Sequence, residues 1–382
     1  MHIAFSLFKY FPHGGIQRDL MKMVRECLSR GHQVRIYAGE WNAPLPELDV
    51  EVVQVPVRAA SNHVRYARFA RWVREHLAKQ PVDLVVGLNK MPGLDAYYAG
   101  DSCYAEKAMT QRGPWYRWLP RYRHFINFER AVFEPEADTQ ILTIAEVDVP
   151  IFRKHYGTPA ARFHPLPPGI DADRAAAADA AAVRKAFRAE FEIAGHDLVL
   201  LFLGSGFIKK GLDRALRGLA ALPAELAART RMLVVGNDNP AKFRRLAVRL
   251  GVGDQVRFFA GRDDIPRFLQ GADALVLPAY DETAGMVILE AMIAGLPALV
   301  SHNCGYAHYL AEADAGLVAD HPFQQADFNA LLVELLTSPE RARWRDNGLQ
   351  WATNPEIYRM PVAAVDYFEQ FASHSAASGG PS

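Results

Sequence analysis

The sequence predicts an α/β protein with two domains, each a doubly wound sheet of parallel strands. Short apolar runs typical of strands alternate with longer runs of helical periodicity along most of the chain. Such strand–helix repetition is typical of parallel sheets. A stiff Leu-Pro-Pro-Gly-Ile stretch at 166–170 separates two series of these repeats, and 382 residues are enough for two cores.

The composition narrows the classes of function. Lys+Arg and Asp+Glu both number 43, so the net charge gives no argument for a nucleic-acid partner. Cys27, Cys103 and Cys304 are far apart and lack metal-ligand spacing, which is typical of reduced thiols in a cytoplasmic protein. The N-terminus lacks a signal-peptide layout, and no apolar run approaches the ~18 residues that span a bilayer. We therefore expect a soluble cytoplasmic protein that meets a membrane, if at all, from the side.

The first half opens with a strand, a loop and a helix. The strand is expected at 3–7 and the helix at 16–30, stopped by Gly31, with Gly14 and Gly15 in the loop between them. Two glycines at a helix N-terminus let the backbone approach a phosphate closely, although they also suit a plain tight turn. The spacing is not G-x-G-x-x-G, so a dinucleotide site is weakly supported.

Further strands in this half are expected at 34–37, 83–87, 94–99 and 139–145, the last of them closing the half. Asp101 follows one of these strands, and ligands in open α/β sheets bind beyond the carboxyl ends of strands. It is therefore a candidate site residue, with a helix cap as the alternative. Asp19, one turn into the first helix, is a second candidate, or a surface acid that complements the helix dipole.

Residues 104–125 interleave arginines with aromatic rings, and Glu106 is their only acid. Aromatic rings sit at headgroup depth and guanidiniums pair with lipid phosphates, so the stretch predicts contact with an anionic membrane surface. Base stacking on nucleic acid and a partly buried helix with snorkelling arginines are the alternatives. The side chains assigned to the membrane are Lys107, Arg112, Trp115, Tyr116, Arg117, Trp118, Arg121 and Arg123.

The second half opens with a wholly apolar strand at 198–203, a glycine-bearing loop and a helix from Leu212. Lys209 and Lys210 adjoin in that loop, where they concentrate positive charge for a diphosphate; a surface basic pair is the alternative. Further strands are expected at 232–235, 256–259, 273–277 and 298–301, with helical patterns from there to the end.

The most informative run follows the strand at 273–277. Pro278 ends the strand, Glu282 lies on the loop, Gly285 opens a helix, and Glu290 falls in its early turns. The first N–H groups of a helix have no intrahelical partner and can hold a diphosphate, while each carboxylate can accept hydrogen bonds from sugar or ribose hydroxyls. A nucleotide-sugar suits this set. A solvated loop glutamate and a helix-start glutamate are the plain alternative.

Over nearly its whole length the chain resembles the retaining glycosyltransferases of family 4, which have the GT-B fold, and 282–290 matches their E-x7-E signature. Within that family it is similar to the transferases that add a hexose to an inner-core heptose of lipopolysaccharide. The matching stretches are 8–12, 14–15, 17–19, 89–95, 101–107, 122–124, 166–170, 282–290 and 304–309. Those relatives usually have Arg-Lys at 209–210, and a lysine at 209 loses bidentate geometry.

The resemblance implies two Rossmann-like domains facing across a cleft. Residues 1–168 would form the acceptor-side domain, with a membrane-interacting segment at 104–133, and 169–355 the nucleotide-sugar domain. A helix at 356–375 would cross back to the first domain, and a disordered tail would follow at 376–382.

The resemblance also implies a UDP-hexose donor, UDP-glucose or a relative, a lipopolysaccharide inner-core heptose as acceptor, and retention at the anomeric carbon. No metal or other cofactor is expected, because lysines and helix N–H groups would offset the diphosphate charge. The expected catalytic residues are Glu282, Asp101 and Asp19. The expected donor-binding residues are Gly14, Gly15, Lys209, Lys210, Arg262, Thr283, Ala284, Gly285, Met286, Val287 and Glu290.

In this scheme Glu282 holds the sugar hydroxyls, Glu290 the ribose and Arg262 the uracil, and Asp101, Asp19 or the departing phosphate takes the acceptor proton. The protein would work peripherally on the cytoplasmic face of the inner membrane. Alternatives are a UDP-sugar epimerase, a transferase of GlcNAc, Gal or GalNAc, and a non-enzymatic membrane-surface protein.

Overall fold

The computed structural model describes residues 1–12 and 14–378. These fold as two compact units, the first made of residues 1–169 with 359–378, the second of residues 170–358. The predicted boundaries, after 168 and after 355, lie close to these. The first break falls at the end of the Pro-Pro-Gly stretch, where the Gly169 carbonyl accepts from Lys22 in unit 1 and the Ile170 N–H donates to the Ile357 carbonyl in unit 2.

Unit 1 contains a seven-stranded parallel sheet in the order β3-β2-β1-β4-β5-β6-β7. Its strands are β1 (His2–Tyr10), β2 (Gln33–Trp41), β3 (Glu51–Gln54), β4 (Leu84–Gly87), β5 (Ala96–Ala99), β6 (Gln140–Thr143) and β7 (Phe163–Pro165). Its helices are α1 (Gly15–Ser29), α2 (Asn62–Leu77), α3 (Tyr104–Thr110), α4 (Pro120–Phe133), α5 (Val149–Tyr156) and α15 (Met360–Ser378), with 3-10 turns η1 (Pro114–Trp118), η2 (Glu146–Asp148) and η3 (Ala160–Arg162).

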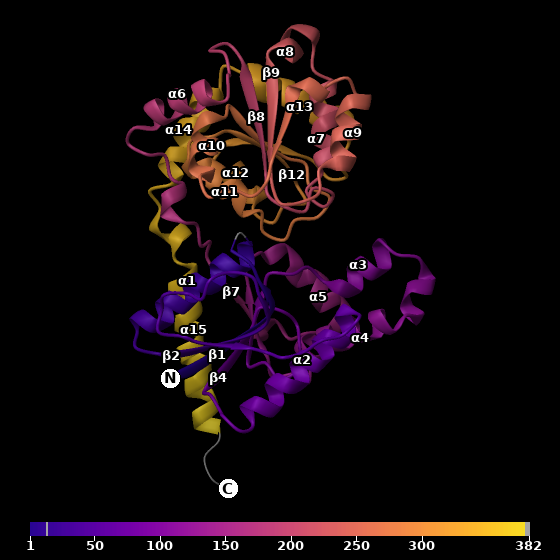
Figure 1. Cartoon of the computed structure of the whole chain (residues 1–382), viewed down its shortest axis with the longest axis vertical. Coiled ribbons are helices and arrows are strands. Elements are labelled where there is room, and N and C mark those ends of the chain that lie inside the picture. Colours follow the sequence, from indigo (N-terminus) through magenta and orange to yellow (C-terminus); the bar gives the residue numbers. More distant parts are fainter. Residues whose placement is uncertain (13, 379–382) are drawn as a thin grey trace. The chain divides into compact units, whose positions relative to one another are not determined.

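Both faces of this sheet are covered. Ile3 and Phe5 of β1 enter the core under α1 and α15, while Ala4 enters the core on the other face, because side chains alternate along a strand. The last helix, α15, belongs to unit 1 and packs against α1, where Arg30 contacts Asp366 at 2.8 Å. The first and the last of the described residues therefore belong to the same unit (Figure 1).

Unit 2 contains a six-stranded parallel sheet in the order β10-β9-β8-β11-β12-β13. Its strands are β8 (Leu198–Leu203), β9 (Thr230–Val235), β10 (Val256–Phe259), β11 (Ala274–Leu277), β12 (Ala298–Ser301) and β13 (Gly316–Ala319). Its helices are α6 (Ala180–Glu190), α7 (Leu212–Ala220), α8 (Ala224–Ala228), α9 (Ala241–Arg249), α10 (Ile265–Gly271), α11 (Met286–Ile293), α12 (Ala307–Glu312), α13 (Gln325–Thr337) and α14 (Arg341–Trp351), with 3-10 turns η4 (Ala172–Arg174), η5 (Gly253–Gln255) and η6 (Pro355–Tyr358).

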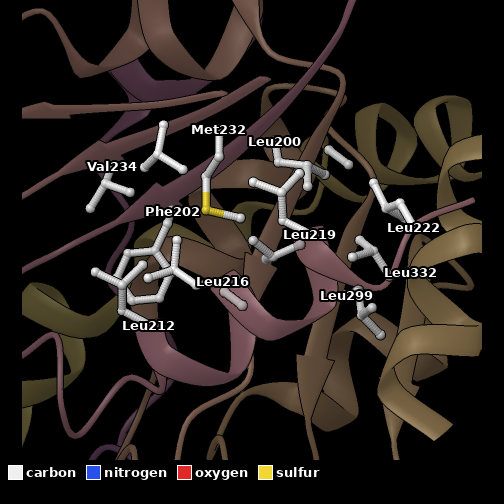
Figure 2. Packing of buried hydrophobic residues seen from close by; sticks show 14 of the residues in the cluster. Leu200, Phe202, Leu212, Leu216, Leu219, Leu222, Met232, Val234, Leu299 and Leu332 are labelled. Carbon is white, nitrogen blue, oxygen red and sulfur yellow. The ribbon is translucent and has the colours of Figure 1, made fainter. Parts of the chain in front are cut away.

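The centre of unit 2 is the strand β8, in which every residue is buried. Figure 2 shows Leu200 and Phe202 of this strand packed with Leu216 and Leu219 of α7 and with Met232 of β9. A strand buried on both faces consists of an unbroken apolar run, and this is why β8 could be predicted from the sequence.

The predicted fold class is confirmed in each unit, but several sequence-based expectations are wrong. The strand expected at 139–145 does not close the first half, because β7 follows it, and β3 and α2 were not predicted. The end of the chain is not wholly helical, because β13 completes the second sheet. These short strands lie at sheet edges; β3 and β7 contain polar residues, whereas β13 is a short apolar run. The expected tail at 376–382 begins too early, since α15 reaches Ser378; residues 379–382 lie outside the described residues.

Candidate active site

The loop between β11 and α11 places Glu282 before a helix N-terminus in unit 2. Gly285 is the residue before the helix and has φ +86°, a left-handed conformation that glycine adopts without strain. The first N–H groups of α11 point back toward this loop, as they do at any helix start. A carboxylate and a row of N–H donors therefore lie at the carboxyl end of the sheet, as the sequence predicts.

A second loop, after β12, holds the Glu282 loop by its backbone. Glu282 forms a parallel bridge with Cys304, in which the Gly305 N–H donates to the Glu282 carbonyl at 3.0 Å. The Tyr306 N–H donates to the Ala284 carbonyl at 2.7 Å. The 304–309 stretch, which carried the family resemblance, thus fixes the position of the Glu282 backbone.

Lys210 and Glu282 form an ion pair between the two loops that carry them. Lys210 Nζ lies 2.8 Å from Glu282 Oε2, and the two side chains are only 12% and 15% exposed. Burial alone would raise the pKa of Glu282, but the ammonium groups of Lys210 and Lys209 outweigh it and hold the pKa below its usual range. Glu282 is therefore ionised at neutral pH and can only accept hydrogen bonds.

The loop that carries Lys210 depends on glycines. Gly211 has φ +75°, and a Cβ there would lie 2.0 Å from the Pro278 carbonyl oxygen, so the two loops approach more closely than any other residue allows. The Asp238 carboxylate, after β9, accepts from the N–H groups of Gly206 and Phe207 at 2.7 and 2.5 Å. Asp238 was not predicted; its position after a parallel strand is the signal that could have found it.

The other residues of unit 2 that were expected to bind the donor have varied surroundings. Thr283, Ala284 and Glu290 are buried, whereas Met286 and Val287 are half-buried. Arg262 donates through Nε to Asp264 Oδ1 at 2.6 Å and through Nη2 to Oδ2 at 2.9 Å, so its guanidinium fork is occupied by a neighbouring carboxylate. Its assignment to uracil stays a prediction, as do the roles of the others.

In unit 1, Gly14 and Gly15 lie at the start of α1. A Cβ on Gly14 would lie 1.8 Å from Gln17 Oε1, whereas one on Gly15 would meet nothing within 4 Å. Asp19 is buried, and the Tyr98 hydroxyl donates to its Oδ2 at 2.8 Å, which ties α1 to β5. Asp101, after β5, is exposed and lines a cavity of about 460 Å³. Their predicted roles toward donor and acceptor remain predictions.

Glu129 of α4 is a buried carboxylate that the sequence interpretation missed. It is fully buried, accepts from Lys90 Nζ at 2.6 Å and from the Tyr104 and Ala105 N–H groups at 2.8 and 2.9 Å, and also accepts from the Tyr156 hydroxyl. Its carboxylate therefore caps the first turn of α3, although Glu129 belongs to another helix, α4. Burial opposes ionisation, yet Lys90 lowers the pKa of Glu129.

The segment assigned to the membrane forms a helical hairpin of α3, η1 and α4, whose connecting turn stands away from the sheet of unit 1 (Figure 1). Trp115 and Trp118 are 65% and 78% exposed. Arg112, Arg117 and Arg123 are exposed, and Tyr116 is half-buried. Lys107 is half-buried and Arg121 is exposed, and both line the 460 Å³ cavity. Among the described residues, no helix is long and apolar enough to cross a membrane.

Two family models match the chain, one described as Glycosyltransferase Family 4 over residues 13–174 and one as Glycosyl transferases group 1 over residues 183–351. Together with the two parallel sheets and the loop geometry of unit 2, they define the class: the chain belongs to the GT-B glycosyltransferases of family 4. The family resemblance seen in the sequence is confirmed.

The individual relatives agree with this class. The lipopolysaccharide glucosyltransferase WaaG of Escherichia coli (strain K12) is 45% identical over 367 residues, which span 96% of this chain and 98% of that protein. A crystal structure of WaaG, a glycosyltransferase involved in lipopolysaccharide biosynthesis, matches with a TM-score of 0.92 over 96% of this chain and 99% of that one, at 44% identity. Anabaena Alr3699/HepE with UDP-glucose, at 18% identity and a TM-score of 0.75 over 99% and 100% of the chains, shares the fold alone.

Proposed function

We propose that this protein transfers glucose from UDP-glucose, with retention, to an inner-core heptose of lipopolysaccharide. The observation that carries the proposal is the buried Lys210–Glu282 pair in front of the α11 N-terminus, in a chain that matches a lipopolysaccharide glucosyltransferase along nearly its whole length. The name of that relative supplies glucose and lipopolysaccharide; UDP, retention and the heptose come from the family resemblance.

The donor chemistry follows from charge. A departing UDP carries negative charge that Lys209, Lys210 and the first N–H groups of α11 can offset, so the proposal needs no metal. Lys210 engages Oε2 of Glu282, which leaves Oε1 to accept from a sugar hydroxyl. Ionisation of Glu282 suits this role, since a protonated carboxyl would spend one oxygen as a donor.

The transfer step exchanges one bond to the anomeric carbon for another. The bond from that carbon to the diphosphate oxygen breaks, and the bond to the heptose oxygen forms on the same face. The heptose proton passes to the departing diphosphate, with Asp101 or Asp19 as the alternative acceptors.

We expect UDP to bind in a calorimetric titration and glucose to pass to a heptose-ended truncated core, at a rate unchanged by EDTA. UDP-glucose consumption in the absence of acceptor would indicate the epimerase alternative instead. A rate lost with EDTA and restored by a divalent ion would contradict the metal-independent step. Parallel assays with UDP-GlcNAc and UDP-Gal test the choice of hexose.

We further propose that the α3–η1–α4 hairpin docks on the anionic, cytoplasmic face of the inner membrane. The exposed Trp115 and Trp118 and the exposed arginines beside them support this. A basic residue near an anionic surface contributes about 1 kcal/mol. Replacing Arg112, Arg117 and Arg123 by glutamine should therefore weaken binding to anionic vesicles by about 3 kcal/mol, roughly 100-fold.

The matched control removes three positive charges elsewhere, from Lys242, Arg245 and Arg249 on α9, all exposed in unit 2. Co-sedimentation with anionic vesicles measures both variants at the same salt concentration. Equal weakening by the two triple variants would mean that net charge, and not the hairpin, attracts the protein to the membrane.

A further inference from the structure

A cavity of about 410 Å³ in unit 2 lies at the opposite end of the sheet from Glu282. Asp273 and Pro297, which line this cavity, directly precede β11 and β12, so it lies at the amino ends of these strands, whereas Glu282 follows the carboxyl end of β11. Small side chains of α6 and α14, such as Ala180 and Ala342, leave the space unfilled. The volume is in the range of sites that bind small molecules.

Three arginines share the carboxylate of Asp273, which is only 11% exposed. Its Oδ1 accepts from Arg184 Nη2 at 2.6 Å and lies 3.8 Å from Arg341 Nη2. Its Oδ2 accepts from Arg188 Nη1 at 3.1 Å and from the Val199 N–H at 2.8 Å. Both carboxylate oxygens are therefore occupied, and three positive charges face a single negative one.

The excess of positive charge acts on Arg341, which belongs to the cavity wall together with Arg184. Burial lowers the pKa of the Arg341 guanidinium, and the charges of Arg184 and Arg229 lower it further, against the opposing effect of Asp273. Partly buried charges that are not matched by a counter-charge are costly, so an anion in the cavity would stabilise this cluster.

Arg345 adds hydrogen-bond donors that the protein itself does not use. It lies one turn after Arg341 on α14, and both residues line the cavity, as an i, i+4 pair on one helix face can. Arg343, between them in sequence, instead pairs with Glu340 at 2.5 Å and with Asp314 at 2.7 Å. Among the described residues, Arg345 has neither a hydrogen-bond nor an ion-pair partner. Its guanidinium fork can therefore take two oxygens of an anion.

We propose that this cavity is a second anion site, which binds the phosphate group of a small phosphorylated compound through Arg345, in the positive field of Arg184 and Arg341. A phosphate monoester carries about −1.5 to −2 at neutral pH, which matches the excess of two charges around Asp273 better than a carboxylate does. The inference goes beyond the proposed transfer reaction and does not depend on it. Because the donor loop lies at the other end of β11, the compound should bind together with the nucleotide.

The test is calorimetric titration of the full chain with inorganic phosphate and with ribose 5-phosphate, each in the absence and in the presence of saturating UDP. We expect both to bind under both conditions, while ribose, which has no phosphate, does not bind. Arg345→Gln should weaken both phosphate ligands about tenfold, as the loss of a charge-assisted hydrogen bond predicts. The variant should fold normally, because the Arg345 side chain is exposed.

The matched control is Arg343→Gln, which removes an equally exposed arginine from the same helix but outside the cavity wall and should bind like the wild type. Equal weakening by the two variants would mean that net charge attracts the phosphate, and it would overturn the proposal. Loss of phosphate binding when UDP is present would place the phosphate in the donor site and would also overturn it. Wild-type protein that binds neither phosphate ligand would do the same.

Discussion

Replacing Glu282 by alanine is expected to lower the rate of glucosyl transfer at least about 100-fold, the usual cost of removing one aligned polar group that acts in the transition state. Two losses combine in this variant. The sugar loses a hydrogen-bond acceptor, and Lys210 loses the carboxylate that fixes its ammonium at 2.8 Å. The measurement is the initial rate of transfer from UDP-glucose to a heptose-ended core acceptor.

The fold should survive this change, because the backbone hydrogen bonds of Glu282 to Asn303 and Gly305 do not involve its side chain. Glu282→Gln is the matched variant: it keeps the size of the side chain and one acceptor oxygen but loses the charge, so it should be impaired less than the alanine variant. UDP should still bind both variants. Full activity of Glu282→Ala would refute the assignment of the donor site.

The loop and helix that carry Glu282 could be predicted from the sequence, but the pairing of Glu282 with Lys210 could not. Gly285 and the strand that ends at Pro278 mark a strand–loop–helix unit within a single stretch of sequence, so the position of Glu282 before a helix followed directly. The pairing of Glu282 with Lys210 joins residues 72 positions apart. This pairing depends on which strands are neighbours, and no local sequence pattern predicts that β8 and β11 are adjacent.

In unit 1, too, the local sequence pattern did not predict which side chains the fold brings together. The aromatic and basic pattern of 104–125 identified a special surface, but it did not show that Arg121 borders a cavity whereas Arg117 does not, although both are exposed. That distinction depends on where α4 lies against the ends of β1 and β4. Glu129 was passed over for a related reason: a single acid in a helix of aromatic and basic residues gives no sign of its buried partners until the fold brings Lys90 to it.

Glu129→Ala is expected to destabilise unit 1 by about 3–5 kcal/mol, the usual cost of breaking a buried ion pair by removing one partner. The variant leaves the Tyr156 hydroxyl and two N–H groups of α3 without their acceptor, and Lys90 without its carboxylate partner, although Lys90 still donates to the Ser102 carbonyl. The midpoint of urea unfolding measures the loss of stability. Faster hydrogen exchange of the 104–110 amides should show that the loss affects α3. Glu134→Ala, an exposed acid just beyond the end of α4, is the control and should change little.

The effect of pH provides a second test of the same pair. Because the folded pKa of Glu129 is lowered, the stability that it contributes is fully present above the unfolded value, about 4.3, and is lost as the pH falls through the folded value. The stability difference between wild type and Glu129→Gln should therefore be constant near neutral pH and shrink below about pH 4. A difference that is flat down to the acid limit would mean that Glu129 acts through packing and not through its charge.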